Sequence, residues 1–203
     1  WKSIAHLEDG KAIFITGGVP GDDAEVLVLK NKKSFAEGKV LQILSPSKQR
    51  VTPFCQHFGL CGGCKWQMLP YAAQLEYKQQ QVDDQLSRIG GIALPPIAPI
   101  LGSEQQTFYR NKLEFTFCTQ QYLTAQEIAA AGDGKITRKP ALGFHAPGMF
   151  DKVVDIETCW LQAEPSNKIK NLLRSLAFEH GFSFYDPRKQ QGWLRNVIVR
   201  VAT

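Results

Sequence analysis

Short apolar runs separated by glycine-bearing turns make up the first part of the chain. The runs at 12–15, 24–29 and 39–44 have the length and side-chain types of strands. The first two are separated by the polar turn 17–22, which contains three glycines and a proline. This pattern predicts a small β-barrel or meander, and the Ser-Pro-Ser sequence at 45–47 reads as the linker that follows it.

Two helices are predicted further along the chain. The first spans 71–89, with Pro70 at its start and Gly90 at its end, and the second spans 165–180 and ends at Gly181. Apolar side chains recur at helical spacing in both, and these are expected to face inward. They are Tyr71, Leu75, Val82, Leu86 and Ile89 in the first helix, and Ile169, Leu172, Leu173 and Leu176 in the second.

Alternating apolar and polar positions predict four further strands after the cysteine-rich segment. The stretch 124–139 is polar and glycine-bearing, so we expect it to be a surface insertion. The fold class is therefore α+β, with a β domain over 1–46 and an α+β domain over 47–203. The four strands are expected at 113–117, 141–144, 153–156 and 196–201.

Composition fits an ordinary globular protein, with 43% hydrophobic and 21% charged residues among 203. No run reaches the roughly 18 apolar residues of a membrane-spanning helix, and the first residues lack an apolar signal-peptide core. We therefore expect a cytoplasmic protein. The chain starts at Trp1 and stops at Thr203 directly after a strand-like run, which suggests a piece of a longer protein.

The charge balance is mildly basic, with a formal net charge of +5. Such a surface suits a polyanionic partner but is also compatible with ordinary surface bias. Lys30, Lys32 and Lys33 lie close to Phe35 at the end of a predicted strand. Basic residues interleaved with aromatic ones are typical of nucleic-acid-binding barrels, although a solvated lysine-rich hairpin explains these residues equally well.

Three of the five cysteines lie within ten residues, at Cys55, Cys61 and Cys64. In a chain without a secretion signal, this C-x5-C-x2-C spacing points to a metal site rather than to disulfides. Gly62 and Gly63 allow the backbone to curl around a ligand and to donate N–H groups to sulfur.

A fourth ligand has to come from elsewhere, because clusters of this kind are usually held by four cysteines. Cys118 continues a predicted strand and reads as a buried free thiol. Cys159 follows a strand end, from which a side chain can reach a neighbouring loop, and is the preferred candidate. His57 offers an alternative, in which three cysteines and one histidine bind a tetrahedral zinc. From spacing alone, both an iron–sulfur cluster and zinc remain open.

The segment RVTPFCQHFGLCGGCKWQ at 50–67 resembles the iron–sulfur segment of the bacterial 23S rRNA (uracil-5-)-methyltransferases and their transfer-RNA relatives. Around it, the turn at 17–22 is similar to a turn in the TRAM barrel of this family, an OB-like barrel whose first strand is not found here. Tyr109-Arg110-Asn111-Lys112, and the run 155–159 that ends in Cys159, are similar to the central domain of the family.

The resemblance implies a [4Fe-4S] cluster held by Cys55, Cys61, Cys64 and Cys159. It also implies an enzyme in which a cysteine thiolate attacks C6 of uracil and a methyl group passes from S-adenosylmethionine to C5. The cofactor pocket and catalytic residues of this family lie in a C-terminal domain that would begin after Thr203. No catalytic or S-adenosylmethionine-binding residue is therefore expected in this chain, and alone it is expected to be inactive.

The implied partner is RNA, most readily 23S rRNA, with no DNA or membrane partner. A target base inside a stem is inaccessible to such chemistry, so it must be turned out or already unpaired. Cationic side chains are candidates for phosphate contacts and aromatic ones for stacking. The candidates are Lys30, Lys32, Lys33, Phe58, Trp66, Tyr109, Arg110, Lys112, Arg195 and Arg200.

Overall fold

The computed structural model describes residues 2–132 and 136–202. The chain forms two compact units, each made of two stretches of sequence. Unit 1 combines Trp1–Pro53 with Trp66–Gly102, and unit 2 combines Phe54–Lys65 with Ser103–Thr203. The cysteine-rich loop thus belongs to the same unit as Cys159. The predicted domain boundary after residue 46 stays a prediction.

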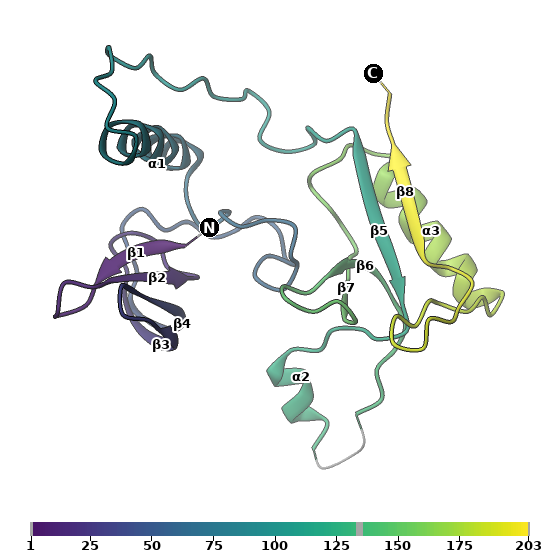
Figure 1. Cartoon of the computed structure of the whole chain (residues 1–203). Coiled ribbons are helices and arrows are strands. Elements are labelled where there is room, and N and C mark those ends of the chain that lie inside the picture. Colours follow the sequence, from purple (N-terminus) through teal and green to yellow (C-terminus); the bar gives the residue numbers. More distant parts are fainter. Residues whose placement is uncertain (1, 133–135, 203) are drawn as a thin grey trace. The chain divides into compact units, whose positions relative to one another are not determined.

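Unit 1 contains a four-stranded sheet in the order β1-β2-β4-β3 (Figure 1). Its strands are β1 (Ser3–His6), β2 (Ala12–Thr16), β3 (Asp23–Asn31) and β4 (Phe35–Ser45). The β2–β4 pair is parallel and the other pairs are antiparallel. The three predicted strands are present, and β1 is an addition that the sequence pattern did not indicate. The predicted barrel is not confirmed, because no pairing among the described residues joins the edge strands β1 and β3.

The turn before β3 is fixed by the carboxylate of Asp22. It accepts the backbone N–H of Val19 at 2.7 Å and of Ser47 at 2.9 Å, and the Nε–H of Arg50 at 3.0 Å. Burial by itself raises the pKa of Asp22, but these hydrogen bonds outweigh it and lower the pKa to about 2. The side chain is only 3% exposed. Asp22 therefore ties the start of β3 to the chain segment that leaves β4.

The first predicted helix is present as α1 (Tyr71–Asp84), continued by the π-helical turn η1 (Gln85–Ile89). Its predicted apolar face is covered only near its start, where an added Cβ at Gly102 would lie 3.1 Å from Leu75 Cδ1. Towards its end the prediction of an inward face is wrong. Val82, Leu86 and Ile89 are 47%, 38% and 83% exposed.

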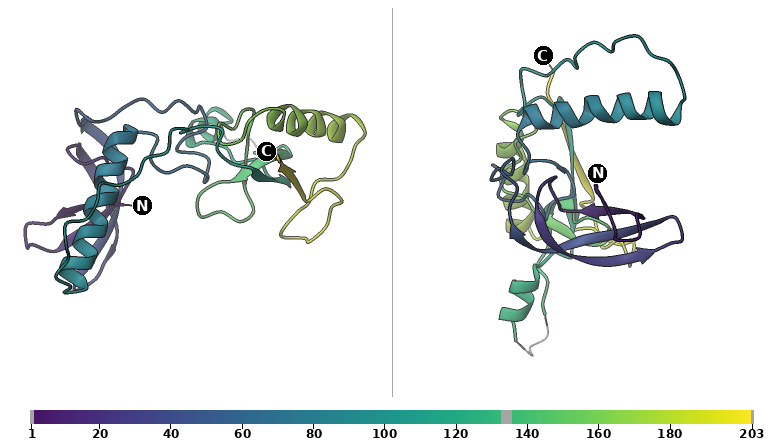
Figure 2. Two further views of the ribbon diagram at one scale, coloured as in Figure 1. Left: turned by 90° about the horizontal axis from the view of Figure 1, so that it is seen from above. Right: turned by 90° about the vertical axis from the view of Figure 1, so that its left-hand side faces the viewer.

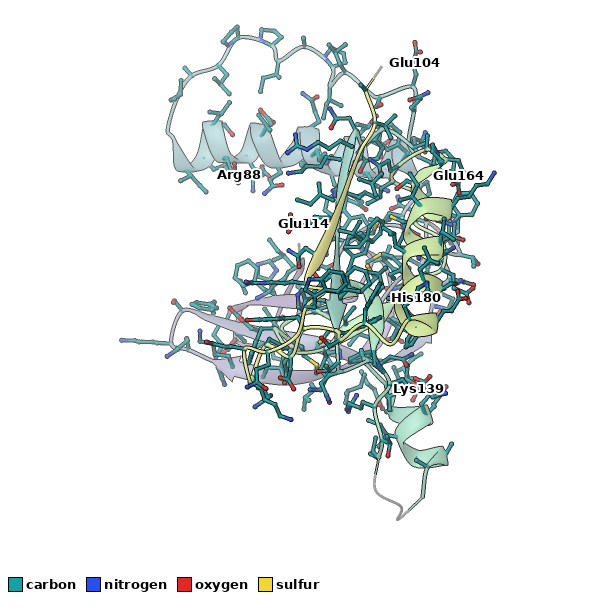
Figure 3. The ribbon with its side chains drawn as sticks, turned by 90° about the vertical axis from the view of Figure 1, so that its right-hand side faces the viewer. Arg88, Glu104, Glu114, Lys139, Glu164 and His180 are labelled. Carbon is teal, nitrogen blue, oxygen red and sulfur yellow. The ribbon has the colours of Figure 1, made fainter. Side chains whose placement is uncertain are left out.

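Unit 2 is built on an antiparallel sheet in the order β7-β6-β5-β8. Helix α3 (Ser166–Glu179) runs along one face of this sheet, as Figures 1 and 2 show. Glu164 and His180 mark its two ends in Figure 3. Apolar side chains of the sheet, including the fully buried Phe115 and Leu142, form the core. The strands are β5 (Lys112–Cys118), β6 (Ala141–His145), β7 (Val153–Asp155) and β8 (Asn196–Arg200). The predicted α+β class is confirmed.

The face that α3 buries differs from the predicted one. Ile169, Leu172 and Leu173, expected to face inward, are 38%, 60% and 36% exposed. The helix instead buries Ser166, Asn167, Lys170 and Ala177. Its polar stripe faces inward because these polar side chains bond to backbone groups of the segment between β7 and α3, as described below.

The predicted surface insertion at 124–139 contains the short helix α2 (Ala125–Ala130). Thr124 and Glu127 form a capping box at its start, in which each side chain accepts a backbone N–H of the other residue. Positions 133–135 of the insertion lie outside the described residues. Among the residues that the structure describes, no helix has both the length and the apolar character needed to cross a membrane.

Candidate functional site

Backbone turns hold the cysteine-rich loop of unit 2 in a tight coil. Phe58 N–H donates to the carbonyl of Cys55 at 3.0 Å, and Cys61 N–H donates to the carbonyl of His57 at 2.9 Å. Gly63 N–H donates to Cys61 Sγ at 3.3 Å, as the paired glycines predicted. The coil brings three cysteines onto one short stretch of backbone, and backbone N–H groups are available to sulfur there.

Two contacts dock this loop on the rest of unit 2. Gly62 N–H donates to the carbonyl of His145 at the end of β6 at 3.2 Å, and a Cβ at Gly62 would lie 2.9 Å from that oxygen. His57 Nε2 accepts the backbone N–H of Glu157 at 3.2 Å. Burial lowers the pKa of His57, which favours the neutral ring that this acceptor role requires. The histidine weighed as a zinc ligand thus ties the loop to the segment carrying Cys159.

Cys159 lies in the core cluster of unit 2, and Cys61 and Cys64 pack against the same cluster. Burial raises the pKa of Cys159, and the neighbouring thiols Cys64 and Cys55 raise it further. Burial also raises the pKa of Cys61 to about 11. All four predicted ligands therefore lie in one neighbourhood. Within the described ranges, however, no group of three or more potential ligand side chains is arranged so that it could already hold a metal ion.

Helix α3 holds the backbone of Cys159 through one side-chain amide. Asn167 Oδ1 accepts the N–H of Cys159 at 2.8 Å, and Asn167 Nδ2 donates to its carbonyl at 3.2 Å. One turn further along, Asn171 Nδ2 donates to the carbonyl of Glu157 at 3.2 Å. Arg174 pairs with Asp155 at 2.8 Å. Polar residues at helical spacing thus fix the whole segment that leads from β7 to Cys159.

Lys170 places a buried cation beside this segment. Its side chain is fully buried, and its ammonium donates to the carbonyls of Ile156 and Glu157. Burial lowers the pKa of Lys170 to about 8, while nearby anionic groups, among them Cys159, act in the opposite direction. Its hydrogen-bond partners are carbonyls, while Asp155, Cys159 and Glu157 lie close enough to favour its charged form.

Aromatic rings surround the residue after Cys159. The ring of Trp160 packs edge-on against Phe54, with centroids 6.0 Å apart. It also packs at a tilt of 41° against Phe108, with centroids 5.6 Å apart. Phe108 N–H donates to the carbonyl of Trp160 at 2.7 Å, although Phe108 has a positive φ of 57°. These three rings are themselves 37% to 52% exposed, so they form an aromatic cluster at the surface beside Cys159.

The fifth cysteine lies apart from the other four. Cys118 ends β5 and belongs to a separate buried cluster with Ala141 and Val153. Its thiol donates to the carbonyl of Asp151 at 3.6 Å and accepts the N–H of Gln120 at 3.4 Å. These contacts fit the expected buried free thiol.

The candidate RNA-contact residues are spread over both units. Lys30, Lys32 and Lys33 are exposed at the end of the β3–β4 hairpin in unit 1, where Lys30 Nζ lies 5.9 Å from the ring centre of Phe35. Phe58 in unit 2 and Trp66 in unit 1 are half-buried. The exposed candidates of unit 2 are Tyr109, Arg110, Lys112, Arg195 and Arg200.

The structure brings only some of these residues together. Lys112 and Arg200 are paired in register on β5 and β8, so their two positive charges are neighbours at one end of the sheet. Arg195 lies over the ring of Tyr185, 4.8 Å from its centre.

Asn167 and Lys170 are site residues that the sequence pattern did not indicate. Polar residues on an amphipathic helix normally face solvent, so helical periodicity assigned them to the outer face. The available signal was indirect. Cys159 lies only a few residues before the helix, in a segment whose buried backbone groups need partners.

Comparison with known proteins identifies relatives over the whole chain. No protein-family model matches it. A protein of Bacteroides thetaiotaomicron named an uncharacterized RNA methyltransferase is 50% identical over 202 residues. One of Porphyromonas gingivalis with the same name is 43% identical over 205 residues. Both alignments cover 100% of this chain, which spans 44% of the length of each relative.

A solved structure shares the fold. It is the Pyrococcus abyssi tRNA (uracil-54, C5)-methyltransferase in complex with S-adenosyl-L-homocysteine, with a TM-score of 0.60 and 24% identity. The match covers 98% of this chain and 42% of that one. The sequence relatives are thus named RNA methyltransferases, and the solved structure shows a shared fold.

Proposed function

We propose that this chain is the RNA-binding and iron–sulfur portion of an S-adenosylmethionine-dependent RNA uracil-C5 methyltransferase. The observation that carries the proposal is the similarity of the entire chain to RNA methyltransferases, at 50% identity in one relative. Since the chain spans less than half of those relatives, the methyl transfer belongs to the longer parent enzyme. The S-adenosylhomocysteine bound to the structural neighbour supports S-adenosylmethionine as the methyl donor of the parent.

The ligand chemistry of four cysteines in unit 2 supports the proposed [4Fe-4S] cluster. Cys55, Cys61, Cys64 and Cys159 would hold it, since four thiols are the usual ligand set and these four share one neighbourhood. The glycine-bearing loop supplies an N–H group to sulfur, and Lys170 supplies a buried positive charge. When bound, the cluster supplies bonds that join the 55–64 loop to a segment about 100 residues away, and so stabilises unit 2.

The part of this chain in the reaction is to bind and orient RNA. Single-stranded or unpaired RNA is recognised by cationic grooves and by rings that stack on bases. Exposed lysines in unit 1 and the Lys112–Arg200 pair in unit 2 support such a role. The chain by itself is proposed to be inactive, because the family that it resembles carries its S-adenosylmethionine pocket and its nucleophile in a C-terminal domain.

Two RNA classes are candidate substrates of the parent. The resemblance of the 50–67 segment favours 23S rRNA, whereas the structural neighbour is an enzyme that acts on a tRNA uracil. A methylation assay with the full-length parent, labelled S-adenosylmethionine and separate 23S rRNA and tRNA transcripts tests both. Label at uracil C5 in the 23S rRNA transcript alone is the expected result. Label in tRNA alone would mean that tRNA, rather than 23S rRNA, is the substrate. No label in either RNA would contradict the proposed activity.

A stand-alone RNA-binding module with structural zinc is the second candidate, supported by the cysteine-rich spacing itself. Metal analysis of anaerobically purified chain separates the two. The iron–sulfur proposal expects a brown protein with about four irons per chain. A colourless protein with about one zinc per chain would favour the zinc module.

A further inference from the structure

Two exposed aromatic rings meet on the loop that joins α3 to β8. Trp193 is 69% exposed and Phe182 is 40% exposed, and their rings pack edge-to-face with centroids 4.7 Å apart. The imidazole of His180, at the end of α3 in Figure 3, stacks on Phe182 at 5.6 Å. Large aromatic side chains are normally buried, so three rings held together at the surface require an explanation.

The loop that carries these rings is anchored in the core of unit 2. Phe184, only 5% exposed, packs edge-on against Phe117 of β5 with centroids 5.0 Å apart. The N–H of Trp193 donates to the carbonyl of Ser183 at 3.1 Å and to its hydroxyl at 3.0 Å. The backbone on both sides of the ring pair is therefore fixed, so the exposed indole is presented in a defined position.

Gly192 allows this presentation. Its φ is +124°, and a Cβ there would lie 2.4 Å from the carbonyl oxygen of Phe184. Only glycine fits such a close approach of two backbone segments. The residue next to it is Trp193, so the tight backbone turn directly determines where the exposed indole lies.

The charge of the same loop suits a polyanion. Arg188, Lys189 and Arg195 lie between 186 and 195, where Asp186 is the one acidic residue in the sequence. Arg188 is already paired with the carboxylate of Asp151 at 2.5 Å, so the proposal uses Lys189 and Arg195 as its cations. The carboxylate of Asp186 is occupied locally, since it accepts the backbone N–H groups of Arg188 at 2.9 Å and Lys189 at 3.1 Å. Arg195 is exposed and lies over the ring of Tyr185. Stacking rings accompanied by cations are the combination that binds single-stranded nucleic acid.

We propose that Phe182 and Trp193, with the cations of the 181–195 loop, form a stacking platform for the bases of a single-stranded RNA segment. The proposal rests on the proposed function, which supplies RNA as the polyanion. It adds a binding site to unit 2. The rings contact base faces while Lys189 and Arg195 contact phosphates. Binding at this platform therefore requires bases but discriminates little between base sequences.

The test compares binding of the whole chain to two probes, a short oligouridylate and an abasic ribose-phosphate oligomer of the same length. Trp193→Ala is expected to weaken binding of the oligouridylate by about 10-fold, and Trp193→Phe to retain most of it. On the abasic oligomer, which keeps the phosphates but offers no base, Trp193→Ala should bind as the unchanged chain does. Leu172→Ala, at a 60% exposed apolar position of α3, is the matched control and should change neither.

The outcomes separate this proposal from the broader one. If the unchanged chain binds oligouridylate and Trp193→Ala binds it equally well, the platform is wrong while the RNA-binding role stands. An equal loss on both probes would show that the indole acts through folding or phosphates, which also overturns the platform. If the unchanged chain binds neither RNA probe, the RNA-binding role falls and the platform falls with it. Circular dichroism of each variant reports whether the fold is retained.

Discussion

The side-chain amide of Asn167 brackets the backbone of Cys159, with Oδ1 accepting its N–H at 2.8 Å and Nδ2 donating to its carbonyl at 3.2 Å. Both residues are buried, at 5% and 7% exposure. A single helical residue therefore sets the position and the direction of the proposed fourth ligand. Such support of a ligand by a neighbouring polar side chain is a common property of metal sites.

Replacing Asn167 by alanine should therefore loosen the proposed cluster without removing any ligand. Loss of this support is expected to lower metal affinity by about 10- to 100-fold, and the two orphaned backbone groups add a cost in stability. Iron content after anaerobic purification, and the rate of iron release to a chelator, measure the effect. Lys168→Ala, at an exposed neighbouring position of α3, is the control. Iron release at the unchanged rate from the Asn167 variant would contradict the positioning role.

Substitution of the cysteines tests the ligand set itself. Cys159→Ser is expected to lose most of the iron, because it removes one of the four proposed thiol ligands. This thiol is buried in the neighbourhood of Cys61 and Cys64. Cys118→Ser should keep its iron, since that thiol lies in a different cluster and bonds to the carbonyl of Asp151. Iron per chain and visible absorption of the two purified variants give the answer. Full iron content in the Cys159 variant would exclude Cys159 as the fourth ligand.

Much of the fold follows from local pattern. The strands around Phe115 and Leu142 follow from alternating apolar positions, which mark the buried face of a sheet. The helix that begins after Pro70 follows from helical apolar spacing, although that spacing did not predict which of its side chains are buried. The open edge of the sheet in unit 1 could not be predicted in this way. Closure of a barrel depends on pairing between strands distant in sequence, here β1 and β3, and no local pattern encodes it.

The site was predictable only as far as its ligands. Spacing points to Cys55, Cys61 and Cys64, because only a few residue types can act as metal ligands. The supporting residues carry no such restriction. From helical spacing, Asn167 and Lys170 are expected to face solvent. They face inward instead, because the buried carbonyl and N–H groups between β7 and α3 need hydrogen-bond partners.

The three lysines of the β3–β4 hairpin should control the salt dependence of RNA binding if they contact phosphates. Changing Lys30, Lys32 and Lys33 together to alanine removes up to three contacts. For single-stranded RNA, the slope of log K against log salt should then become shallower by about 2. Affinities measured at several salt concentrations for the unchanged chain and the triple variant test this, with Lys168→Ala as the control. An unchanged slope would mean that these lysines do not contact RNA phosphates.

The stability of unit 1 should fall in acid because of Asp22. Its folded-state pKa, about 2, lies below the ordinary value of 3.8, so the folded state holds the carboxylate more strongly than the unfolded chain does. A lowered pKa contributes stability above the unfolded value and loses it as pH falls. The contribution, about 2 kcal/mol near neutral pH, should decline progressively between about pH 5 and pH 2.

The variant Asp22→Asn isolates this contribution from those of other carboxyl groups. It keeps the size of the side chain but removes the charge that binds the Arg50 guanidinium, so its stability should be lower than that of the unchanged chain near pH 6. Urea unfolding followed by circular dichroism at about pH 6 and about pH 3 gives the difference at each pH. The gap should narrow by about 1 kcal/mol at the lower pH, because the unchanged chain loses its advantage as Asp22 takes up a proton. A gap of constant size at both pH values would mean that the carboxylate acts through its geometry rather than through its charge.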